Sequence, residues 1–306
     1  MTLVLTVTAP DSIWLVADRR LSSRGSTVKD DGRKLTFLET TDGVAILGYA
    51  GLGATAKGVE PADWMSAVLR GRNLPLEQCL SLLAKAIQTQ IPRHLKRMTE
   101  FRQPAHHVIC PAFLGESVRL YSIDLVLSED RKRHWFRYTR HVAQSSPESP
   151  SLTPRVGIAG SGAVYLSQHR EWIRPLLRVV RAHDRGQVSS RAVGDHLARL
   201  NHEVHLAMKD QSVGPRCTVA WRLRKGGRHQ GGGGHQFYTG TERDSSSPSL
   251  PTIVTGIDLS ALVEVMMPHF QGQLRETGAG RQGELDKDKI NAELARLPEK
   301  PDEDLP

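Results

Sequence analysis

The first fifty residues of this chain consist largely of short apolar runs separated by turn residues, which restricts the fold to one that begins with antiparallel strands. A turn at Pro10-Asp11-Ser12 separates the first two runs, and Asp42-Gly43 is typical of the two-residue turn of a hairpin. The predicted strands are residues 2–8, 13–17, 34–38 and 44–50. The sequence therefore predicts two successive β-hairpins.

The remaining pattern predicts groups of helices and further strands. Apolar residues recur every three or four positions from Leu76 to Leu95, which predicts an amphipathic helix that Pro92 kinks or shortens. Further strands are expected at residues 107–114, 118–127, 135–142 and 217–223, and helices at 164–183 and 190–209. Sheets with helices packed outside them would bury the apolar faces of all these elements, so we expect an α+β fold.

Composition divides the chain into three parts. Residues 1–223 carry the regular pattern and predict one domain. Residues 224–270 are expected to form an extension packed on that domain, with Gly231–Gly234 as a flexible hairpin or loop, because no Lys-Ser or Lys-Thr pair follows to make a phosphate site. Residues 271–306 are polar, end in a Pro-rich segment and predict a flexible tail.

Charge and cysteine content limit the partners and the compartment. The formal net charge is +8, but the basic residues are spread out and no nucleic-acid motif accompanies them, so nucleic acid is not an expected partner. Cys79, Cys110 and Cys217 lack the spacing of a zinc site or a disulfide framework, which predicts a reducing compartment and no metal. Neither a signal peptide nor a membrane span is visible, so we expect a cytoplasmic protein.

Thr2 is the residue with the clearest chemical potential. It follows Met1 directly, and removal of Met1 would give one residue both a hydroxyl nucleophile and an α-amine able to act as its base. A lysine such as Lys34 would lower the pKa of that amine, and a carboxylate such as Asp18 would hold the lysine in place. The alternative is that Thr2 is simply the second residue of a short strand.

The opening Thr2-Leu-Val-Leu-Thr-Val, the segment Val16-Ala-Asp-Arg-Arg-Leu-Ser22 and Lys34 together resemble the proteasome-type branch of the N-terminal nucleophile hydrolases, which includes proteasome β-subunits and HslV. The resemblance covers roughly residues 2–223 and implies a four-layer αββα sandwich of two antiparallel sheets flanked by helices. It implies that Thr2 is the nucleophile, that Asp18 orients Lys34, and that Lys34 tunes the α-amine. Arg20 and Ser22 then fall at substrate-binding positions.

Gly48-Tyr49-Ala-Gly51 is similar to a Gly-Phe-Ala-Gly segment of the same family. The resemblance assigns the backbone N–H of Gly51 to the oxyanion, a role that suits a glycine because no side chain blocks the approach of the carbonyl. Tyr49 would then border the substrate pocket. A plain core aromatic on a strand is the alternative for Tyr49.

Two segments later in the chain extend the resemblance. Gly160-Ser161-Gly162 resembles a turn that places Ser161 beside the threonine amine, although such a turn also serves as an ordinary helix cap. Residues 210–214 resemble the motif Asp-x-x-Ser-Gly, which implies that Asp210 supports the nucleophile. Val213 stands in the place of the motif serine and Ser212 is displaced by one, so either Ser212 substitutes or one hydrogen bond is missing.

The resemblance implies a threonine endopeptidase that acts on a peptide or unfolded protein without metal or organic cofactor. It also implies a homo-oligomeric ring, and any ATP-dependent unfoldase would be a separate chain, because no ATP-binding motif is present. Two alternatives stay open: an N-terminal nucleophile amidase acting on a small amide, and a non-catalytic scaffold subunit. Val213 and the unusual residues 224–306 favour these alternatives.

Overall fold

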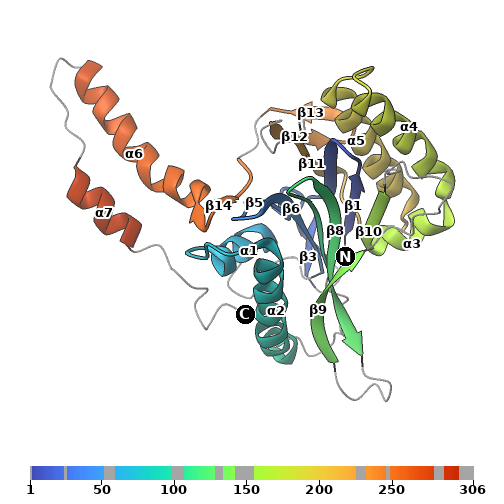
Figure 1. Cartoon of the computed structure of the whole chain (residues 1–306), viewed down its shortest axis with the longest axis horizontal. Helices are drawn as coiled ribbons and strands as arrows, with labels where there is room; N and C mark the ends of the chain where they lie inside the picture. The colour runs from blue at the N-terminus through green and yellow to red at the C-terminus, as the bar shows by residue number, and fades with distance from the viewer. Residues whose placement is uncertain are drawn as a thin grey trace.

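The protein has an α+β fold in which two large β-sheets are accompanied by helices (Figure 1). A computed structural model describes the chain except residues 1, 24–25, 52–58, 98–106, 128–133, 142–154, 225–231, 246–248, 279–285 and 296–306. In the described part of the chain, no helix combines the length and the apolar character that crossing a membrane requires.

The first sheet has six strands in the order β10-β1-β2-β11-β12-β13, and every neighbouring pair is antiparallel. β1 and β2 form the first predicted hairpin. All residues of both strands are buried, because this sheet is covered on each face. The strands are β1 (Leu3–Thr8), β2 (Ser12–Asp18), β10 (Arg155–Gly160), β11 (Arg216–Leu223), β12 (Gly233–Thr239) and β13 (Glu242–Asp244).

The second sheet has seven strands in the order β15-β14-β5-β6-β7-β8-β9. β5 and β6 form the second predicted hairpin. This sheet is mixed rather than purely antiparallel, because β14 pairs in parallel with β5. Its strands are β5 (Leu35–Glu39), β6 (Gly43–Ala50), β7 (His107–Leu114), β8 (Ser117–Leu127), β9 (His134–His141), β14 (Thr252–Val254) and β15 (Ile257–Asp258). A separate hairpin joins β3 (Leu21–Ser23) to β4 (Ser26–Lys29).

The helices fall into three groups along the chain (Figure 1). The single helix predicted for residues 164–183 is wrong in detail, because the chain forms α3, a short 3₁₀ turn and then α4. Pro175 lies in the first turn of α4, where its missing N–H costs no intrahelical bond. Pro92 lies within α2, which continues beyond it. The helices are α1 (Pro61–Leu69), α2 (Leu76–Arg97), α3 (Ser161–Gln168), α4 (Ile173–Asp184), α5 (Ser190–Ala207), α6 (Leu259–Gly278) and α7 (Lys287–Ala295).

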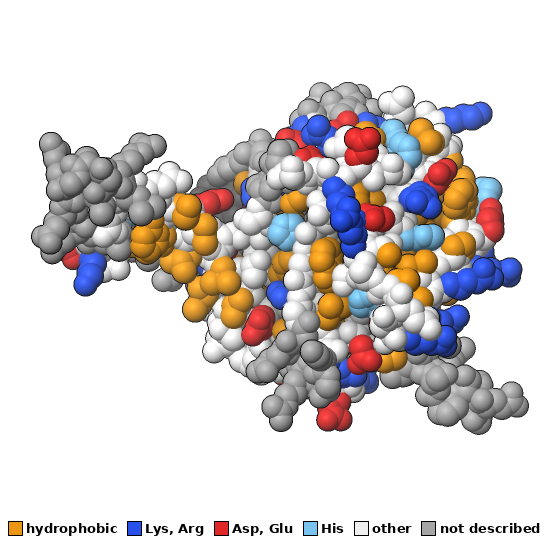
Figure 2. Space-filling model, turned by 90° about the horizontal axis from the view of Figure 1, so that it is seen from above, with side chains coloured by type: hydrophobic (Ala, Val, Ile, Leu, Met, Phe, Trp, Pro, Cys, Tyr) orange, Lys and Arg blue, Asp and Glu red, His pale blue; other side chains and the backbone are white. Residues whose placement is uncertain are grey.

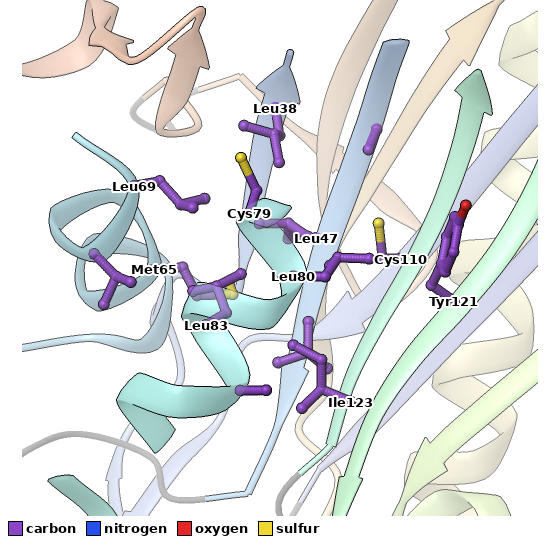
Figure 3. Close-up of a cluster of buried hydrophobic side chains, with 14 of the residues drawn as sticks. Leu38, Leu47, Met65, Leu69, Cys79, Leu80, Leu83, Cys110, Tyr121 and Ile123 are labelled. Atoms are coloured by element: carbon purple, nitrogen blue, oxygen red, sulfur yellow. The ribbon is translucent and has the colours of Figure 1, made fainter. Parts of the chain in front are cut away.

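Three clusters of buried apolar side chains hold these elements together. One lies between the two sheets and includes Val4 of β1 and Ile46 of β6. A second joins α3, α4 and α5 to the first sheet. The third joins α1 and α2 to the second sheet, and Figure 3 shows Leu80 and Leu83 of α2 among its side chains. The clusters therefore connect the two sheets with each other and with the helices.

The glycine tract at 231–234 is not simply a loop. Gly233 and Gly234 belong to β12 and pair with Arg222 and Trp221 of β11, while residues 225–231 lie outside the described part. A Cβ atom on Gly234 would lie 2.8 Å from the Trp221 ring. The absent side chain lets the indole cover the strand, a packing reason that the sequence alone does not reveal.

The C-terminal segment contains more helix than its polar sequence predicts. α6 extends from the body as an arm, passes the expected start of the tail at residue 271 and ends at Gly278 (Figure 1). Figure 2 shows hydrophobic side chains gathered along this arm, and four of them are exposed: Leu259, Val263, Met267 and Phe270. The good helix propensity of Gln, Leu, Arg and Glu explains why the helix continues into the polar region.

Candidate active site

Thr2, Asp18 and Lys34 lie close together at the ends of β1, β2 and β5. The antiparallel hairpin brings the start of β1 beside the end of β2, and β5 begins directly after Lys34. The Thr2 hydroxyl donates a hydrogen bond to Asp18 Oδ1. Lys34 Nζ donates to Thr2 Oγ1 at 2.5 Å and to Asp18 Oδ1 at 3.0 Å. The structure thus brings together the three residues on which the predicted chemistry depends.

All three residues are buried, with exposed fractions of 2% for Thr2, 0% for Asp18 and 5% for Lys34. The carboxylate of Asp18 also accepts hydrogen bonds from the backbone N–H groups of Leu3 at 2.7 Å, Arg20 at 3.1 Å and Gly214 at 3.1 Å. Backbone donors and the lysine together satisfy both oxygens, which offsets the cost of burying a charge. Asp18 is therefore a rigid anchor for Thr2 and Lys34.

The environment of Lys34 changes its acid–base behaviour. Burial lowers its pKa below the usual value for lysine, although the nearby Asp18 carboxylate opposes that shift. A lysine of this kind holds its proton less firmly than an exposed one. Because Nζ of Lys34 donates a hydrogen bond to Thr2 Oγ1, the lysine charge acts directly on the hydroxyl.

A chain of hydroxyl groups supports Thr2 from the side of β10 and α3. Ser161 Oγ donates to the backbone carbonyl of Thr2 at 3.3 Å and lies 2.8 Å from Ser212 Oγ. The backbone N–H of Ser212 donates to Asp210 Oδ1 at 3.0 Å. Val213 is fully buried in the cluster beneath the first sheet. Ser212, and not Val213, therefore lies beside Ser161, and a role of Ser212 in catalysis stays a prediction.

Sequence reasoning noted Ser212 but did not assign it to the site. Gln211 adopts a positive φ of 49°, which is uncommon for a residue other than glycine and turns the chain just before Ser212. The only signal in the sequence for this role of Ser212 was its position between Asp210 and Gly214. The backbone turn that directs its hydroxyl toward Ser161 could not be read from the residue types.

Gly160 is required where β10 passes the start of β1. Its φ is +87°, and a Cβ atom at this position would lie 2.1 Å from the backbone oxygen of Thr2. Leu3 and Gly160 are cross-strand partners. The absence of a side chain here sets how closely Ser161 and Thr2 approach each other.

The end of β6 lies beside Lys34. The backbone N–H of Tyr49 donates to the carbonyl of Lys34 at 3.1 Å, and Gly51 follows two residues later with a φ of +153°. The role of Gly51 as an oxyanion donor stays a prediction. The Tyr49 side chain packs in the cluster between the second sheet and its helices, with its ring 6.5 Å from that of Trp64, as the core-aromatic alternative describes.

Arg20 is engaged within the protein. Its Nε and Nη2 donate to the two oxygens of Asp30 at 2.6 and 2.9 Å, and Nη1 donates to the carbonyl of Gln211 at 2.6 Å. The hydrogen bond with Asp30 raises the pKa of Arg20 and lowers that of Asp30. These contacts hold the loop that carries Gln211, and the substrate-binding role of Arg20 stays a prediction. Ser22 belongs to β3, but its side chain lies outside the described residues.

Within the described ranges, no group of three or more His, Cys, Asp or Glu side chains is placed to hold a metal ion.

No protein-family model matches the sequence. No curated protein matches it either. Among solved structures, the chain is similar to Anbu (ancestral beta-subunit) from Yersinia bercovieri, with 13% sequence identity over 79% of this chain and 88% of that chain and a TM-score of 0.44. At this level of similarity, the likeness supports no argument about function.

The predicted membership in the proteasome β-subunit and HslV family is therefore wrong as an assignment, because no family model matches and the structural similarity is weak. The prediction depended on a few short motifs at strand ends. Such motifs specify a local arrangement of side chains, whereas a family is defined over the whole chain. The geometry of Thr2, Asp18 and Lys34 does not depend on that assignment.

Proposed function

We propose that this protein hydrolyses amide bonds with the Thr2 hydroxyl as nucleophile, and that it acts as a threonine-type peptidase. The observation that carries the proposal is the buried cluster in which Lys34 Nζ lies 2.5 Å from Thr2 Oγ1 while Asp18 holds both groups. Placing a lysine and a carboxylate out of water is costly. A threonine that only completes a strand gives no reason for that cost.

The reaction begins with removal of Met1, which frees the α-amine of Thr2. As Oγ1 forms a bond to the substrate carbonyl carbon, the α-amine takes the hydroxyl proton. The ammonium of Lys34 disfavours a second charge on the α-amine and stabilises the developing negative charge on Oγ1. When the carbon–nitrogen bond breaks, the α-ammonium returns its proton to the leaving amine. Water then hydrolyses the ester on Thr2.

The remaining site residues complete this scheme. The N–H of Gly51 stabilises the oxyanion, and a single donor of this kind typically contributes about a hundredfold or more in rate. Ser161, Ser212 and Asp210 hold the backbone of Thr2 in place. Every acid, base and nucleophile in the scheme is a protein group, so the proposed reaction uses no metal and no organic cofactor.

The proposal extends to the setting of the reaction. The substrate is a peptide or unfolded protein, the layers are arranged as αββα, and the protein assembles into a homo-oligomeric ring in the cytoplasm, where a separate ATP-dependent unfoldase can supply substrate. Cys79, Cys110 and Cys217 are free and buried, and burial raises the pKa of each thiol, that of Cys79 to about 11. Protonated, unpaired thiols suit a reducing compartment.

The experiment that tests the proposal compares wild type with Thr2→Ala. Intact mass should show loss of Met1 and covalent labelling of Thr2 by a threonine-directed electrophile. Cleavage of fluorogenic peptides should fall about a thousandfold or more in Thr2→Ala, because the nucleophile is gone. Thr6→Ala is the matched control, since Thr6 lies on the same strand and donates only to the carbonyl of Trp14.

The same experiment separates the alternatives. Retention of Met1 together with unlabelled Thr2 would refute the proposed chemistry and favour a scaffold role. Labelling of Thr2 combined with turnover of small acylated amines but not of peptides would instead identify an amidase that acts on a small amide.

A further inference from the structure

A second polar cluster lies on β7, β8 and β9 and consists of His107, Ser122, Asp124 and His141. His107 Nδ1 lies 2.7 Å from Asp124 Oδ1. Ser122 Oγ donates to Asp124 Oδ2 and lies 2.7 Å from His141 Nε2. No step of the reaction described above uses these residues.

The hydrogen bonds in this cluster determine where its protons lie. Burial by itself raises the pKa of Asp124, but hydrogen bonds from His107 and Ser122 outweigh it, so the pKa of Asp124 lies below its usual value. Asp124 is therefore a carboxylate and accepts from both neighbours. Ser122 gives its proton to Asp124, so His141 donates to Ser122. Because Asp124 Oδ1 accepts from Nδ1 of His107, Nε2 is the ring nitrogen that is left for a ligand.

His107 faces the space between the two sheets. It is the cross-strand partner of Ala50, and such partners share a face of the sheet. Ala50 packs in the cluster between the sheets, as does Ile109, two residues after His107 on the same face. About a third of the His107 side chain is exposed to solvent. Among the residues that the structure describes, Nε2 has no hydrogen-bond partner.

The cluster also lies at the same end of β6 as the candidate active site. Ala50 directly precedes Gly51. The backbone N–H of the neighbouring Tyr49 donates to the carbonyl of Lys34, which lies on the other side of β6 from His107. Lys34 and His107 therefore flank the end of β6, about two strand spacings or roughly 10 Å apart. An extended chain advances about 3.4 Å per residue, so this separation corresponds to a few residues of substrate.

Building on the proposed function, we propose that His107 is a substrate-binding residue. Its Nε2 accepts a hydrogen bond from a backbone N–H of the substrate, a few residues from the bond that Thr2 attacks. Asp124 positions the ring, and Ser122 and His141 position Asp124. The substrate class that fits this arrangement is an extended peptide, because a small amide would not reach His107.

The test uses two substrates with each protein. One is an internally quenched peptide that extends several residues on both sides of the cleaved bond, and the other is a minimal acylated amino-acid coumarin amide. His107→Ala should lower kcat/KM for the long peptide about tenfold, mainly through KM, as expected for the loss of one hydrogen bond. The minimal substrate should change by less than about twofold, since it does not reach His107.

Conservative and control variants distinguish binding from a structural role. His107→Gln, whose amide oxygen can accept a hydrogen bond near the position of Nε2, should recover most of the loss with the long peptide. His169→Ala is the matched control, because His169 is a partly exposed histidine between α3 and the 3₁₀ turn and contacts Glu171. It should leave both substrates unaffected.

Three results would overturn the inference. Equal losses for the two substrates in His107→Ala would mean that the cluster only maintains the fold of β7, β8 and β9. No loss for either would mean that Nε2 binds nothing in the reaction. If Thr2 of the wild type is not labelled and neither substrate is cleaved, the proposed function fails and this inference fails with it. If Thr2 is labelled, either of the first two results contradicts only the role of His107 and leaves the proposed function intact.

Discussion

At the scale of single residues, the central feature is a buried ion pair that holds a threonine hydroxyl. Thr2, Asp18 and Lys34 were predicted from residue types and spacing, and the structure brings them together. Ser212 was identified only as a displaced serine, and its contact with Ser161 depends on the backbone turn at Gln211. His107 and Asp124 carry no recognisable motif, because cross-strand pairing alone brings them together.

The lowered pKa of Lys34 predicts a pH-dependent contribution to stability. Above its folded pKa but below the value of 10.5 expected for the unfolded chain, the unfolded state binds the proton and the folded state does not. The free energy of unfolding therefore rises with pH in this window, by about 1.4 kcal/mol per pH unit, and the contribution is absent below the window.

Urea unfolding of wild type and Lys34→Met across the alkaline range measures this effect as a difference. The wild type should gain stability relative to the variant as pH rises toward 10.5. Tyr121 and Tyr238 have pKa values raised by burial and act in the opposite direction, but they are common to both proteins and cancel. Parallel pH profiles would show that the pKa of Lys34 is not lowered.

At the scale of elements, the strand ends decide where the chemistry lies. The short apolar runs and turn residues of the first fifty positions predicted both N-terminal hairpins, and the structure confirms them. The helix α1 was missed, because it is short, begins at Pro61 and follows residues without a clear helical period. The split between α3 and α4 was missed because both helices place apolar residues on the same sheet, so the pattern continues across the break.

Gly160 provides the sharpest test of how one element places another. In Gly160→Ala, the new Cβ would clash with the Thr2 carbonyl, so the start of β1 has to move. We expect a loss of about 1–3 kcal/mol from this overpacking and a loss of electrophile labelling at Thr2 of about tenfold or more.

Gly186→Ala is the matched control, because Gly186 also has a positive φ of 71° but open space around its Cβ position. It should show only the backbone strain, about 1 kcal/mol, and normal labelling. Equal effects of the two substitutions on labelling would show that the contact with Thr2 is not important. Thermal unfolding and intact mass provide both measurements.

At the scale of the whole molecule, residues beyond 223 complete both sheets. β12 and β13 extend the first sheet, and β14 and β15 extend the second. Ile253 is fully buried, Leu250 is 2% exposed, and Arg70 donates to Asp258 at 2.6 Å across the two segments. The chain after residue 223 thus contributes strands to both sheets and buried side chains to the core.

Two truncations test this arrangement. A chain that ends at Ser249 loses β14 and the burial of Leu250 and Ile253, which should cost about 3–6 kcal/mol at about 1.5–3 kcal/mol for each side chain. A chain that ends at Val265 keeps these residues and the first turns of α6, and it should retain nearly full stability. Denaturant unfolding of the two proteins decides the matter, and similar stabilities would contradict the prediction.

The sequence by itself determined the strand-rich start, the main amphipathic helices and the three residues that meet at Thr2, because local periodicity and turn chemistry act over short stretches of chain. The tertiary structure alone decided that β14 pairs in parallel with β5 and that Gly234 lies under Trp221. It also decided that His107 and Lys34 lie on either side of the same end of β6. These features join residues far apart in the chain, and their energies come from packing and pairing that no local pattern specifies.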